Sequence, residues 1–434
     1  MPPLPADAKA AAASGADTAL AFALEGFRCA TAAGRPAPEE LLPLFTRSLA
    51  TLVRQALDPQ RGDPAFRAAV LRAQDAAVQE HVRLAAHRAA DARAVRTAVA
   101  AVAHPGKLAS VQDPVLREAL RRLHEGAASG DWPELHHQLQ ALSTQELAPD
   151  LALPLSRLAG QPALGSLLRQ DELLRLEPVR RYRALCALQG PGAGTEAAAA
   201  DGLASARAGA DAEQHTAEVF AAIAALLNRH ARGPGAHRVV RSLRTPAGFP
   251  AAMAKAKDEW DAAIVRGPEG RSPAEILLLA EVKAAPAAAT PDFGRLLRGL
   301  QRLAAADADA SYLFMCDEGE ACLSGASLRR LQPQGPSLPP HVIYACTAAV
   351  EAQVQALSAA TRGVLLAQPP SIAFAQALLD GSDPEPGLLA AIWQALPTAA
   401  HLRSALHQYQ TAQAARGAML HPDDLLAAVR AQFA

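Results

Sequence analysis

Hydrophobic positions in the first part of the chain recur with the period of an α-helix. Between Leu41 and Val53, leucine, phenylalanine and valine fall every three or four positions, with polar residues opposite them, which is the pattern of an amphipathic helix. The pattern continues to Gln189 and is interrupted by short stretches rich in proline, glycine and aspartate. We therefore predict an α-helical domain of bundle or repeat type over residues 17–189, preceded by a flexible tail over residues 1–16.

The pattern changes in the middle of the chain. Residues 190–207 are rich in glycine, alanine and serine and contain almost no large apolar side chain, which predicts a linker. After this linker, a helix over Glu213–Arg229 is followed by short apolar runs with β-branched and aromatic residues, which are typical of strands. The expected strands are His237–Leu243, Asp261–Val265, Ile276–Val282, Ser311–Cys316 and His341–Cys346, with an amphipathic helix over Asp292–Ala306 after the third strand.

The elements after the linker occur in the order helix, three strands, helix and strand. This order predicts an α/β domain over residues 208–347. From residue 348 to residue 434 the helical pattern returns, with breaks at prolines and glycines, so we predict a C-terminal helical region there. Composition supports helix outside the central domain, because alanine is abundant and aromatic residues make up only 4% of the chain.

The stretch from Ser272 to Lys283 is open to two interpretations. A Ser-Pro-x-Glu capping box that begins at Ser272 would start a helix, in which Glu281 and Lys283 point to different faces. Against this, residues 276–280 are apolar at every position, as expected for a central strand that is buried on both faces. We favour the strand, in which Glu281 and Lys283 share one face.

Candidate chemistry follows from this strand. If Asp261–Val265 and Ile276–Val282 are neighbouring strands, then Asp261, Glu281 and Lys283 lie together at one edge of the sheet. Two carboxylates are suited to a hard divalent cation such as Mg²⁺, and the lysine could orient or help deprotonate a water. Phosphodiester hydrolysis needs charge neutralisation at the phosphoryl oxygens and an activated water. The sequence therefore predicts a metal-dependent phosphodiesterase site.

With this order of elements, the spacing from Asp261 to the Glu-Val-Lys tripeptide at 281–283 resembles the PD-(D/E)XK nuclease superfamily. That superfamily includes restriction endonucleases, Holliday-junction resolvases and RecB-type exonucleases. The resemblance covers about residues 209–346, and Trp260 stands where the pattern has proline. It implies a three-layer α/β/α core with a mixed sheet, Mg²⁺ or Mn²⁺ as cofactor, and DNA rather than RNA as substrate. It also implies that the main-chain carbonyl of Val282 binds the metal.

A further acid is expected from the helix before the first strand. Glu213 lies in helical phase with the apolar residues Phe220 and Ile223, whereas Glu218 points about the opposite way. Gly209 and Glu213 are also similar to the Gly-x-x-x-Glu opening of resolvase-type members. We therefore assign Glu213 as an additional catalytic residue and metal ligand.

Nucleic-acid binding would have to come from a local cluster of basic residues, because the net charge of the chain is −1. Arginines share one face of the helix over residues 292–306, beside Gln301, where RecB-like members often carry a glutamine. A solvated helix face is the alternative interpretation of these arginines. The predicted nucleic-acid-binding residues are Arg241, Arg244, Lys255, Lys257, Arg295, Arg298, Gln301 and Arg302.

The cysteines and histidines suggest no second site. The five cysteines are scattered and form no Cys-x-x-Cys pair, which argues against a disulfide framework and a zinc site. The neighbouring histidines His81 and His87, and His136 and His137, lack the spacing and the third ligand of a helical metal site.

We expect a cytoplasmic protein without a signal peptide or a membrane span. The N-terminal stretch has no basic segment followed by an apolar core, and no apolar run reaches the ~18 residues needed to span a bilayer. The alternative to an active nuclease is an inactive nuclease-like module that binds nucleic acid or protein, with the helical domains contacting the protein partner. The resemblance leaves a homodimer open, since many such nucleases cut two strands as dimers.

Overall fold

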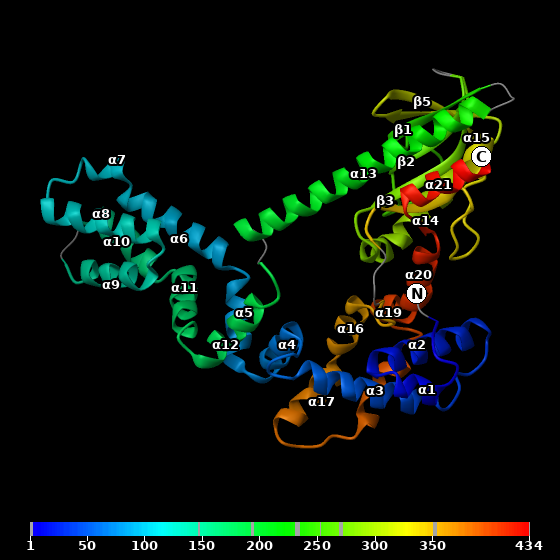
Figure 1. The fold of residues 1–434 in the computed structure, drawn as a ribbon. Coiled ribbons are helices and arrows are strands. Elements are labelled where there is room, and N and C mark those ends of the chain that lie inside the picture. Colours follow the sequence, from blue (N-terminus) through cyan, green and yellow to red (C-terminus); the bar gives the residue numbers. More distant parts are fainter. Residues whose placement is uncertain are drawn as a thin grey trace. The chain divides into compact units, whose positions relative to one another are not determined.

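The computed structural model describes residues 3–145, 148–191, 195–230, 235–251, 253–268, 272–349 and 354–433. The chain divides into two compact units (Figure 1). Because the helical unit interrupts the sheet unit in the sequence, the sheet unit is assembled from separate segments. The helical unit consists of Val53–Gly190 and Ile372–Asp383, and the sheet unit consists of Met1–Leu52, Pro191–Ser371 and Pro384–Ala434.

Aspartate side chains begin several helices of the helical unit. Asp63, Asp75, Asp113 and Asp131 each accept a hydrogen bond from a backbone N–H in the first turn of the helix that follows. These bonds satisfy donors that have no partner inside the helix, which explains why the polar breaks in the sequence separate helices. The helices are α4 (Pro64–Gln74), α5 (Ala76–Ala85), α6 (Arg88–Ala103), α7 (Pro105–Leu108), α8 (Pro114–Ser129), α9 (Trp132–Ser143), α10 (Pro149–Ala159), α11 (Pro162–Leu173) and α12 (Glu177–Ala187).

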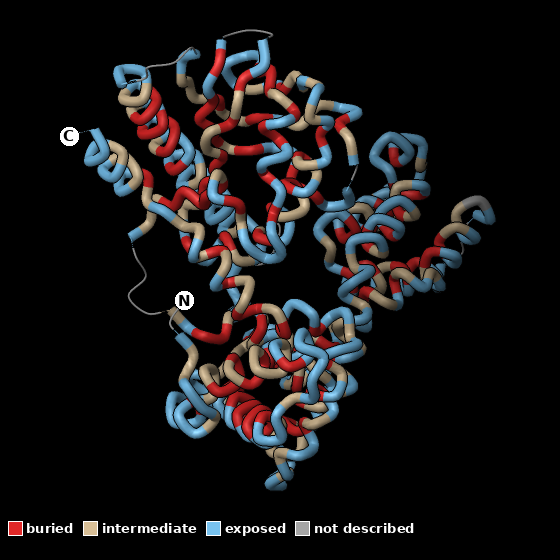
Figure 2. Tube along the Cα trace, turned by 90° about the vertical axis from the view of Figure 1, so that its right-hand side faces the viewer, coloured by how far each residue is buried: buried red, intermediate tan, exposed pale blue. Residues whose placement is uncertain are grey.

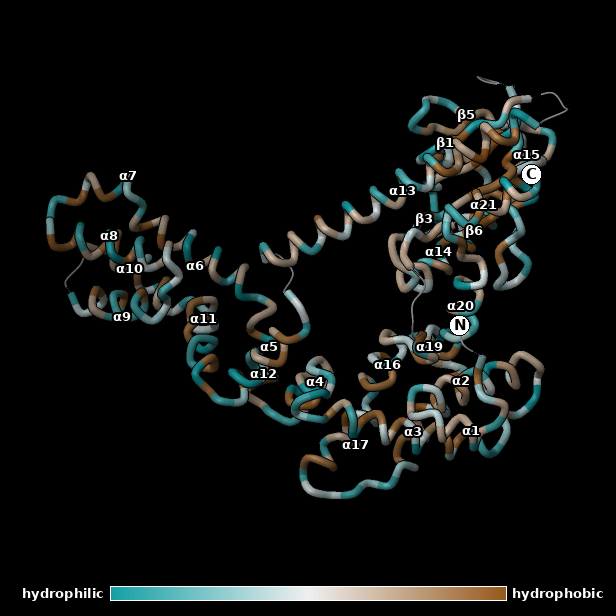
Figure 3. Tube along the Cα trace, viewed as in Figure 1, coloured by the Kyte–Doolittle hydropathy of each residue, from teal (hydrophilic) through white to brown (hydrophobic). Residues whose placement is uncertain are grey.

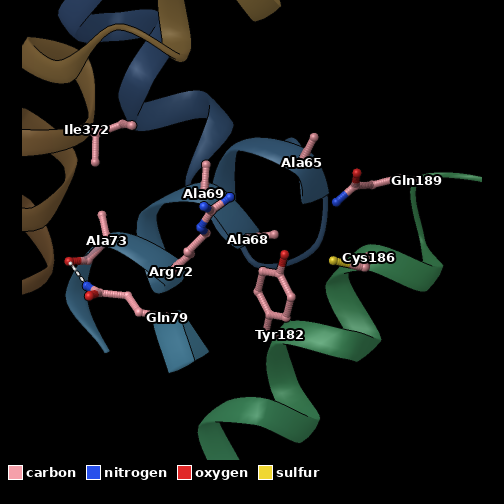
Figure 4. A pocket seen from close by; sticks show the side chains of 10 residues that line it. All are labelled: Ala65, Ala68, Ala69, Arg72, Ala73, Gln79, Tyr182, Cys186, Gln189 and Ile372. Atoms are coloured by element: carbon pink, nitrogen blue, oxygen red, sulfur yellow. Dashed lines mark hydrogen bonds between the residues drawn. The ribbon is translucent and has the colours of Figure 1, made fainter. Parts of the chain in front are cut away.

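A cavity of about 590 Å³ lies beside α4 and α12 in the helical unit (Figure 4). Tyr182 of α12 projects toward the alanines of α4, between Arg72 and Cys186. The described residues that line this cavity include no carboxylate. The cavity therefore lacks the paired acids predicted for the active site, and those acids lie in the sheet unit.

Within the described residues, the sheet unit contains a mixed sheet of seven strands in the order β5-β4-β1-β2-β3-β6-β7. Strands β1, β2 and β3 form an antiparallel meander, and β6 pairs with β3 in parallel. Hydrophobic residues lie along much of the length of these strands (Figure 3). The strands are β1 (Ala236–Arg244), β2 (Glu259–Gly267), β3 (Glu275–Lys283), β4 (Ser311–Cys316), β5 (Gly319–Ser324), β6 (Val342–Cys346) and β7 (Met419–Leu420).

Helices cover both faces of the central strands. On one face, Phe220 and Ile223 of α13 pack in a cluster with Ala262. On the other face, Phe293 of α14 packs in a cluster with Trp260. Buried residues concentrate in the strands and on the helix sides that face them (Figure 2), so the sheet lies between two layers of helix. The two helices are α13 (Glu196–His230) and α14 (Ala289–Ala304).

The stretch that was open to two interpretations is strand β3, so its interpretation as a helix is wrong. β3 lies between β2 and β6, and its apolar residues contact both layers. Leu279 packs in the cluster on the α14 side, and Ala280 packs in the cluster on the α13 side. Burial on both faces therefore outweighs the helix-start pattern at Ser272.

Parts of the two segments predicted to be flexible are helical, while residues 1, 2 and 192–194 of these segments lie outside the described residues. Ala8–Ala13 form α1, and Oδ1 of Asp7 accepts a hydrogen bond of 2.7 Å from the backbone N–H of Ala10. Residues 196–207, which the composition predicts to be a linker, form the first part of α13. Alanine has the highest helix propensity of the amino acids, so an alanine-rich segment tolerates the occasional glycine. Composition alone does not separate such a helix from a linker.

The N-terminal helices fold with the sheet unit rather than with the helical domain predicted over residues 17–189. The rings of Phe27 and Phe45 lie against the ring of Trp393, with centroid separations of 4.7 and 5.3 Å. The sequence pattern predicts these helices but not their partners near the other end of the chain. The helices of these two regions are α2 (Ala16–Ala32), α16 (Ala359–Leu366), α18 (Ala390–Ala395), α19 (Arg403–Leu406), α20 (Gln408–Gly417) and α21 (Pro422–Gln432). Two helices begin in the sheet unit and end in the helical unit: α3 (Leu41–Ala56) and α17 (Pro369–Leu379).

Candidate active site

The candidate site lies where β2 and β3 separate. Their last backbone pair joins Ala262 to Ala280, and Asp261 and Glu281 follow directly, one on each strand. On the other side of β2, Ser242 of β1 is skipped in the pairing and has a φ of 48°, which is uncommon for a residue other than glycine. The β2–β3 ladder therefore ends at the level of Asp261, whereas β1 and β2 pair again beyond it at Leu243 and Trp260.

Asp261 connects the two strands through its side chain. Its Oδ2 accepts a hydrogen bond of 2.7 Å from the backbone N–H of Val282, and its Oδ1 lies 3.3 Å from Nζ of Lys257. The first contact fixes the carboxylate beside β3, and the second gives it a positively charged partner. Asp261 is thus brought to the strand that carries the other predicted catalytic residues.

Glu281 is a deeply buried carboxylate, with 2% of its surface exposed. Its Oε2 lies 2.5 Å from Nζ of Lys257, and its Oε1 lies 2.8 Å from Nζ of Lys283. Burial, together with the negative charge of Asp261, raises the pKa of Glu281 to about 7. Nearby ammonium groups act in the opposite direction. The position therefore favours any cation that can approach the carboxylate.

Lys283 points to the same side of β3 as Glu281, as expected for residues two apart on a strand. Its Nζ also lies 2.9 Å from Oδ2 of Asp292. Burial acts to lower the pKa of Lys283, but Glu281 and Asp292 outweigh it and hold the pKa above its ordinary value. Burial acts to raise the pKa of Asp292, but the hydrogen bond from Lys283 holds it below its ordinary value. Lys283 is therefore an ammonium at neutral pH.

Asp292 is a member of the site that sequence reasoning missed. It lies in the first turn of α14, where an acid is also favoured by the helix dipole. Its place at the start of the helix that follows β3 is the available sequence signal. That signal is weak, because acids in the first turn of a helix are common whether or not they belong to a site.

Lys257 is placed differently from the prediction. It is predicted to contact nucleic acid from a loop, but only 7% of its surface is exposed. Its ammonium contacts the carboxylates of both Asp261 and Glu281. Lys255, two residues earlier in the same loop, is exposed. Lys257 therefore belongs to the candidate site rather than to a basic surface.

Arginines of α14 hold the loop that carries Lys257, residues 253–258. Nη2 of Arg298 donates a hydrogen bond of 3.0 Å to the carbonyl of Lys255, and Arg302 forms an ion pair with Asp258. Both arginines are predicted to bind nucleic acid. In the structure they position this loop, and through it they position Lys257.

The loop and α14 approach each other most closely at Gly299. The backbone N–H of Lys257 donates to the carbonyl of Arg295 at 3.3 Å. A Cβ at position 299 would lie 2.9 Å from both Cβ and the carbonyl oxygen of Lys257, and 3.0 Å from the ring of Trp260. We expect Gly299→Ala to lower the free energy of unfolding by about 1–3 kcal/mol, because backbone atoms must shift to make room. Urea-induced unfolding followed by circular dichroism measures this change.

Gly294 provides a matched control on the same helix. It is exposed, and a Cβ there would meet only an ordinary contact, 3.6 Å from Nη1 of Arg298. Gly294→Ala should leave stability unchanged or raise it by up to about 1 kcal/mol, since alanine favours a helix over glycine. Equal stability of the Gly299→Ala and Gly294→Ala proteins would contradict the close packing of this loop.

Glu213, the acid chosen on helical phase, has an electrostatic link to the site. Its side chain is on α13 and is exposed. Partial burial and the negative charge of Asp261 raise the pKa of Glu213, while the charge of Lys257 acts in the opposite direction. Glu218 instead accepts a hydrogen bond from Gln214 on the same helix.

The other residues predicted to bind nucleic acid do not form one free basic patch. Arg241 pairs with Glu318 at 2.7 Å, and Arg244 pairs with Glu259 at 3.3 Å, so acids already neutralise these arginines. Among the predicted residues, those that are exposed on α14 and the neighbouring loop are Lys255, Arg295 and Gln301.

Comparison of the chain with protein-family models, with curated proteins and with solved structures finds no match. In the parts of the chain that the structure describes, no helix combines the length and the apolar character needed to cross a membrane.

The acids of the site fit a hard divalent cation. The described residues hold no group of three or more histidine, cysteine, aspartate or glutamate side chains arranged around a metal position. Asp261 and Glu281, however, already share one cation in the form of the Lys257 ammonium. Mg²⁺ commonly takes one or two protein carboxylates and completes its coordination with water and substrate phosphate oxygens. Two converging carboxylates are therefore a sufficient donor set.

Proposed function

We propose that this protein is a nuclease that hydrolyses phosphodiester bonds with Mg²⁺ or Mn²⁺, with DNA preferred to RNA. The observation that carries this proposal is the meeting of Asp261, Glu281 and Lys283 where β2 and β3 separate. An acid pair beside an ammonium group is what the hydrolysis of a phosphodiester requires. The order α13, β1, β2, β3 and α14 supports the assignment of a PD-(D/E)XK nuclease core.

The acids have distinct roles in this proposal. Asp261 and Glu281 would hold the cation, the carbonyl of Val282 would add a ligand, and Glu213 would approach from α13. When bound, the cation would neutralise charge on the phosphoryl oxygens and lower the pKa of a water. The hydrogen bond from the Val282 N–H to Asp261 keeps one of these acids oriented before substrate arrives.

Lys283 would act as a hydrogen-bond donor. Glu281 and Asp292 hold it as an ammonium, so it can donate to the attacking water or to a phosphoryl oxygen. A lysine with a raised pKa is a poor acceptor of a proton. Of the two roles that the sequence suggests for this lysine, to orient or to help deprotonate the attacking water, a raised pKa favours the first.

The substrate would be bound beside the site through its phosphate backbone. Exposed Lys255, Arg295 and Gln301 lie on the loop and the helix next to the acids, where cationic and amide groups can contact phosphates. Cutting both strands of a duplex requires a second site, so we propose a homodimer for that reaction. The helical unit is proposed to contact a protein partner or a nucleic-acid structure.

Cation-dependent cleavage tests the proposed function. The purified chain is incubated with supercoiled plasmid, single-stranded DNA and RNA in Mg²⁺, in Mn²⁺ or in chelator. We expect cleaved DNA with either cation and intact DNA with the chelator. A folded protein that cleaves none of these substrates contradicts the proposal. If it still binds nucleic acid or protein, the alternative of an inactive nuclease-like module is favoured instead.

A further inference from the structure

Among the described side chains, two ammonium groups contact the carboxylate of Glu281, one at each oxygen. Lys283 lies 2.8 Å from Oε1 and has its second partner in Asp292, at 2.9 Å. Lys257 lies 2.5 Å from Oε2 and has its second partner in Asp261, at 3.3 Å. Lys257 thus bridges the two candidate metal ligands, whereas Lys283 connects one of them to α14.

An ammonium and a divalent cation compete for the same oxygens. A buried pair of carboxylates is costly without a positive partner, so Lys257 stabilises Asp261 and Glu281 in the metal-free protein. A divalent cation bound at these oxygens would lie close to the ammonium and repel it in a poorly solvated site. In its present position, Lys257 would therefore compete with a metal for Asp261 and Glu281.

The surroundings of Lys257 allow its side chain to leave while its backbone stays. The backbone is fixed by the bond from the Lys257 N–H to Arg295 and by the contact of Arg298 with the Lys255 carbonyl. The side chain itself is a flexible four-carbon stem. The next residue in the chain, Asp258, is exposed to solvent, with its side chain 64% accessible. A rotation of the Lys257 side chain can therefore bring its ammonium to solvent.

We infer that Lys257 is a tethered cation that closes the site in the absence of metal and is displaced when Mg²⁺ or Mn²⁺ binds. This inference rests on the proposed function and adds regulation to it. The site would be ordered and charge-compensated without metal, and it would open only when the free cation concentration is high enough to displace the lysine. The lysine thereby sets the cation threshold of the site.

Direct binding of Mn²⁺ to the full chain, without substrate, tests this inference. Lys257→Met keeps an unbranched side chain and removes the charge. We expect it to bind Mn²⁺ at least about tenfold more tightly than the unchanged chain, because binding no longer has to break a buried ion pair. Calorimetric titration or the electron paramagnetic resonance signal of free Mn²⁺ gives the affinity.

Lys255→Met is the matched control. It removes one positive charge from an exposed position in the same loop and should leave Mn²⁺ affinity within about twofold, since solvent and salt screen that charge. Lys257→Gln, which keeps a hydrogen-bond donor beside the acids, replaces Lys257→Met if circular dichroism shows that the latter is unfolded.

The outcomes separate this inference from the proposed function. Equal or weaker Mn²⁺ binding by Lys257→Met, with clear binding by the unchanged chain, overturns the competition and leaves the metal site in place. If neither protein binds Mn²⁺, the metal site itself is contradicted, and the proposed function fails together with the inference. Tighter binding by both Lys257→Met and Lys255→Met would assign the effect to general charge and also overturn it.

Discussion

Replacing Asp261 with asparagine is expected to reduce cation-dependent DNA cleavage by on the order of 10³-fold, which corresponds to about 4 kcal/mol of transition-state stabilisation. The asparagine oxygen can still accept the hydrogen bond that Val282 donates to Asp261 at 2.7 Å, so the contact between β2 and β3 is kept. What is lost is one of the two negative charges that would bind the cation. Initial rates of plasmid nicking and Mn²⁺ titration of the same protein measure the two effects.

Glu259 offers a control for this substitution on the same strand. It lies two residues before Asp261, is exposed, and pairs with Arg244 at 3.3 Å. Glu259→Gln removes the same charge and should keep the cleavage rate within about twofold, because exposed ion pairs contribute little. Cleavage by Asp261→Asn at the rate of the unchanged chain would place the chemistry elsewhere.

The second large effect is expected at Lys283. Lys283→Met should lower kcat by about 10²–10³-fold, the usual cost of removing one preorganised hydrogen-bond donor to the transition state, without weakening Mn²⁺ binding. The reason is the location of Lys283. It contacts Oε1 of Glu281 and Oδ2 of Asp292, which leaves Oε2 of Glu281 and the carboxylate of Asp261 for the cation. Single-turnover cleavage at saturating Mn²⁺, combined with Mn²⁺ titration, separates catalysis from cation binding.

Two further variants show whether the effect of Lys283→Met comes from the charge of Lys283 or from its contact with Asp292. Lys283→Arg keeps the positive charge between Glu281 and Asp292 and should retain more activity than Lys283→Met. Asp292→Asn keeps the Lys283–Glu281 contact of 2.8 Å and should lose less activity than either lysine variant. Loss of Mn²⁺ affinity together with cleavage in Lys283→Met would show that the lysine maintains the geometry of the acids instead of acting on the substrate.

The strands around the site could be predicted because strands that are buried on both faces have uninterrupted apolar runs in the sequence. β3 is covered by α13 on one face and by α14 on the other, so residues 276–280 are apolar without alternation. The same run is compatible with a buried helix, and periodicity alone does not distinguish the two. Pairing of β3 with β2 and β6 decides the conformation, and this pairing depends on parts of the chain outside the run.

The site itself was predictable only where its residues lie on these strands. Asp261, Glu281 and Lys283 occupy positions that strand geometry relates to one another. Lys257 and Asp292 reach the same place through tertiary contacts: the loop of Lys257 packs against α14, and Asp292 is brought to Lys283 by the path of the chain after β3. Each has the local sequence of an exposed position.

Sheet edges and helix partners were also beyond prediction from local patterns. β5 is a short strand with small residues at Gly319 and Ala321, and it forms through its hairpin with β4. β7 consists of Met419 and Leu420 alone and exists because it pairs beside β6. Such strands carry little hydrophobic pattern of their own.

The division of the sheet unit into separated segments has a consequence for how the protein is made. Phe27 and Asp17 of α2 have Trp393 and Arg362 as partners, and those residues leave the ribosome only after Val53–Gly190, the larger segment of the helical unit, has been synthesised. Most of the helical unit comes from one continuous segment, so it can fold during that interval. Until its partners are synthesised, the apolar face of α2 stays exposed to solvent and can be bound by chaperones. The N-terminal helices are thus among the first parts of the protein to be made and among the last to be completed.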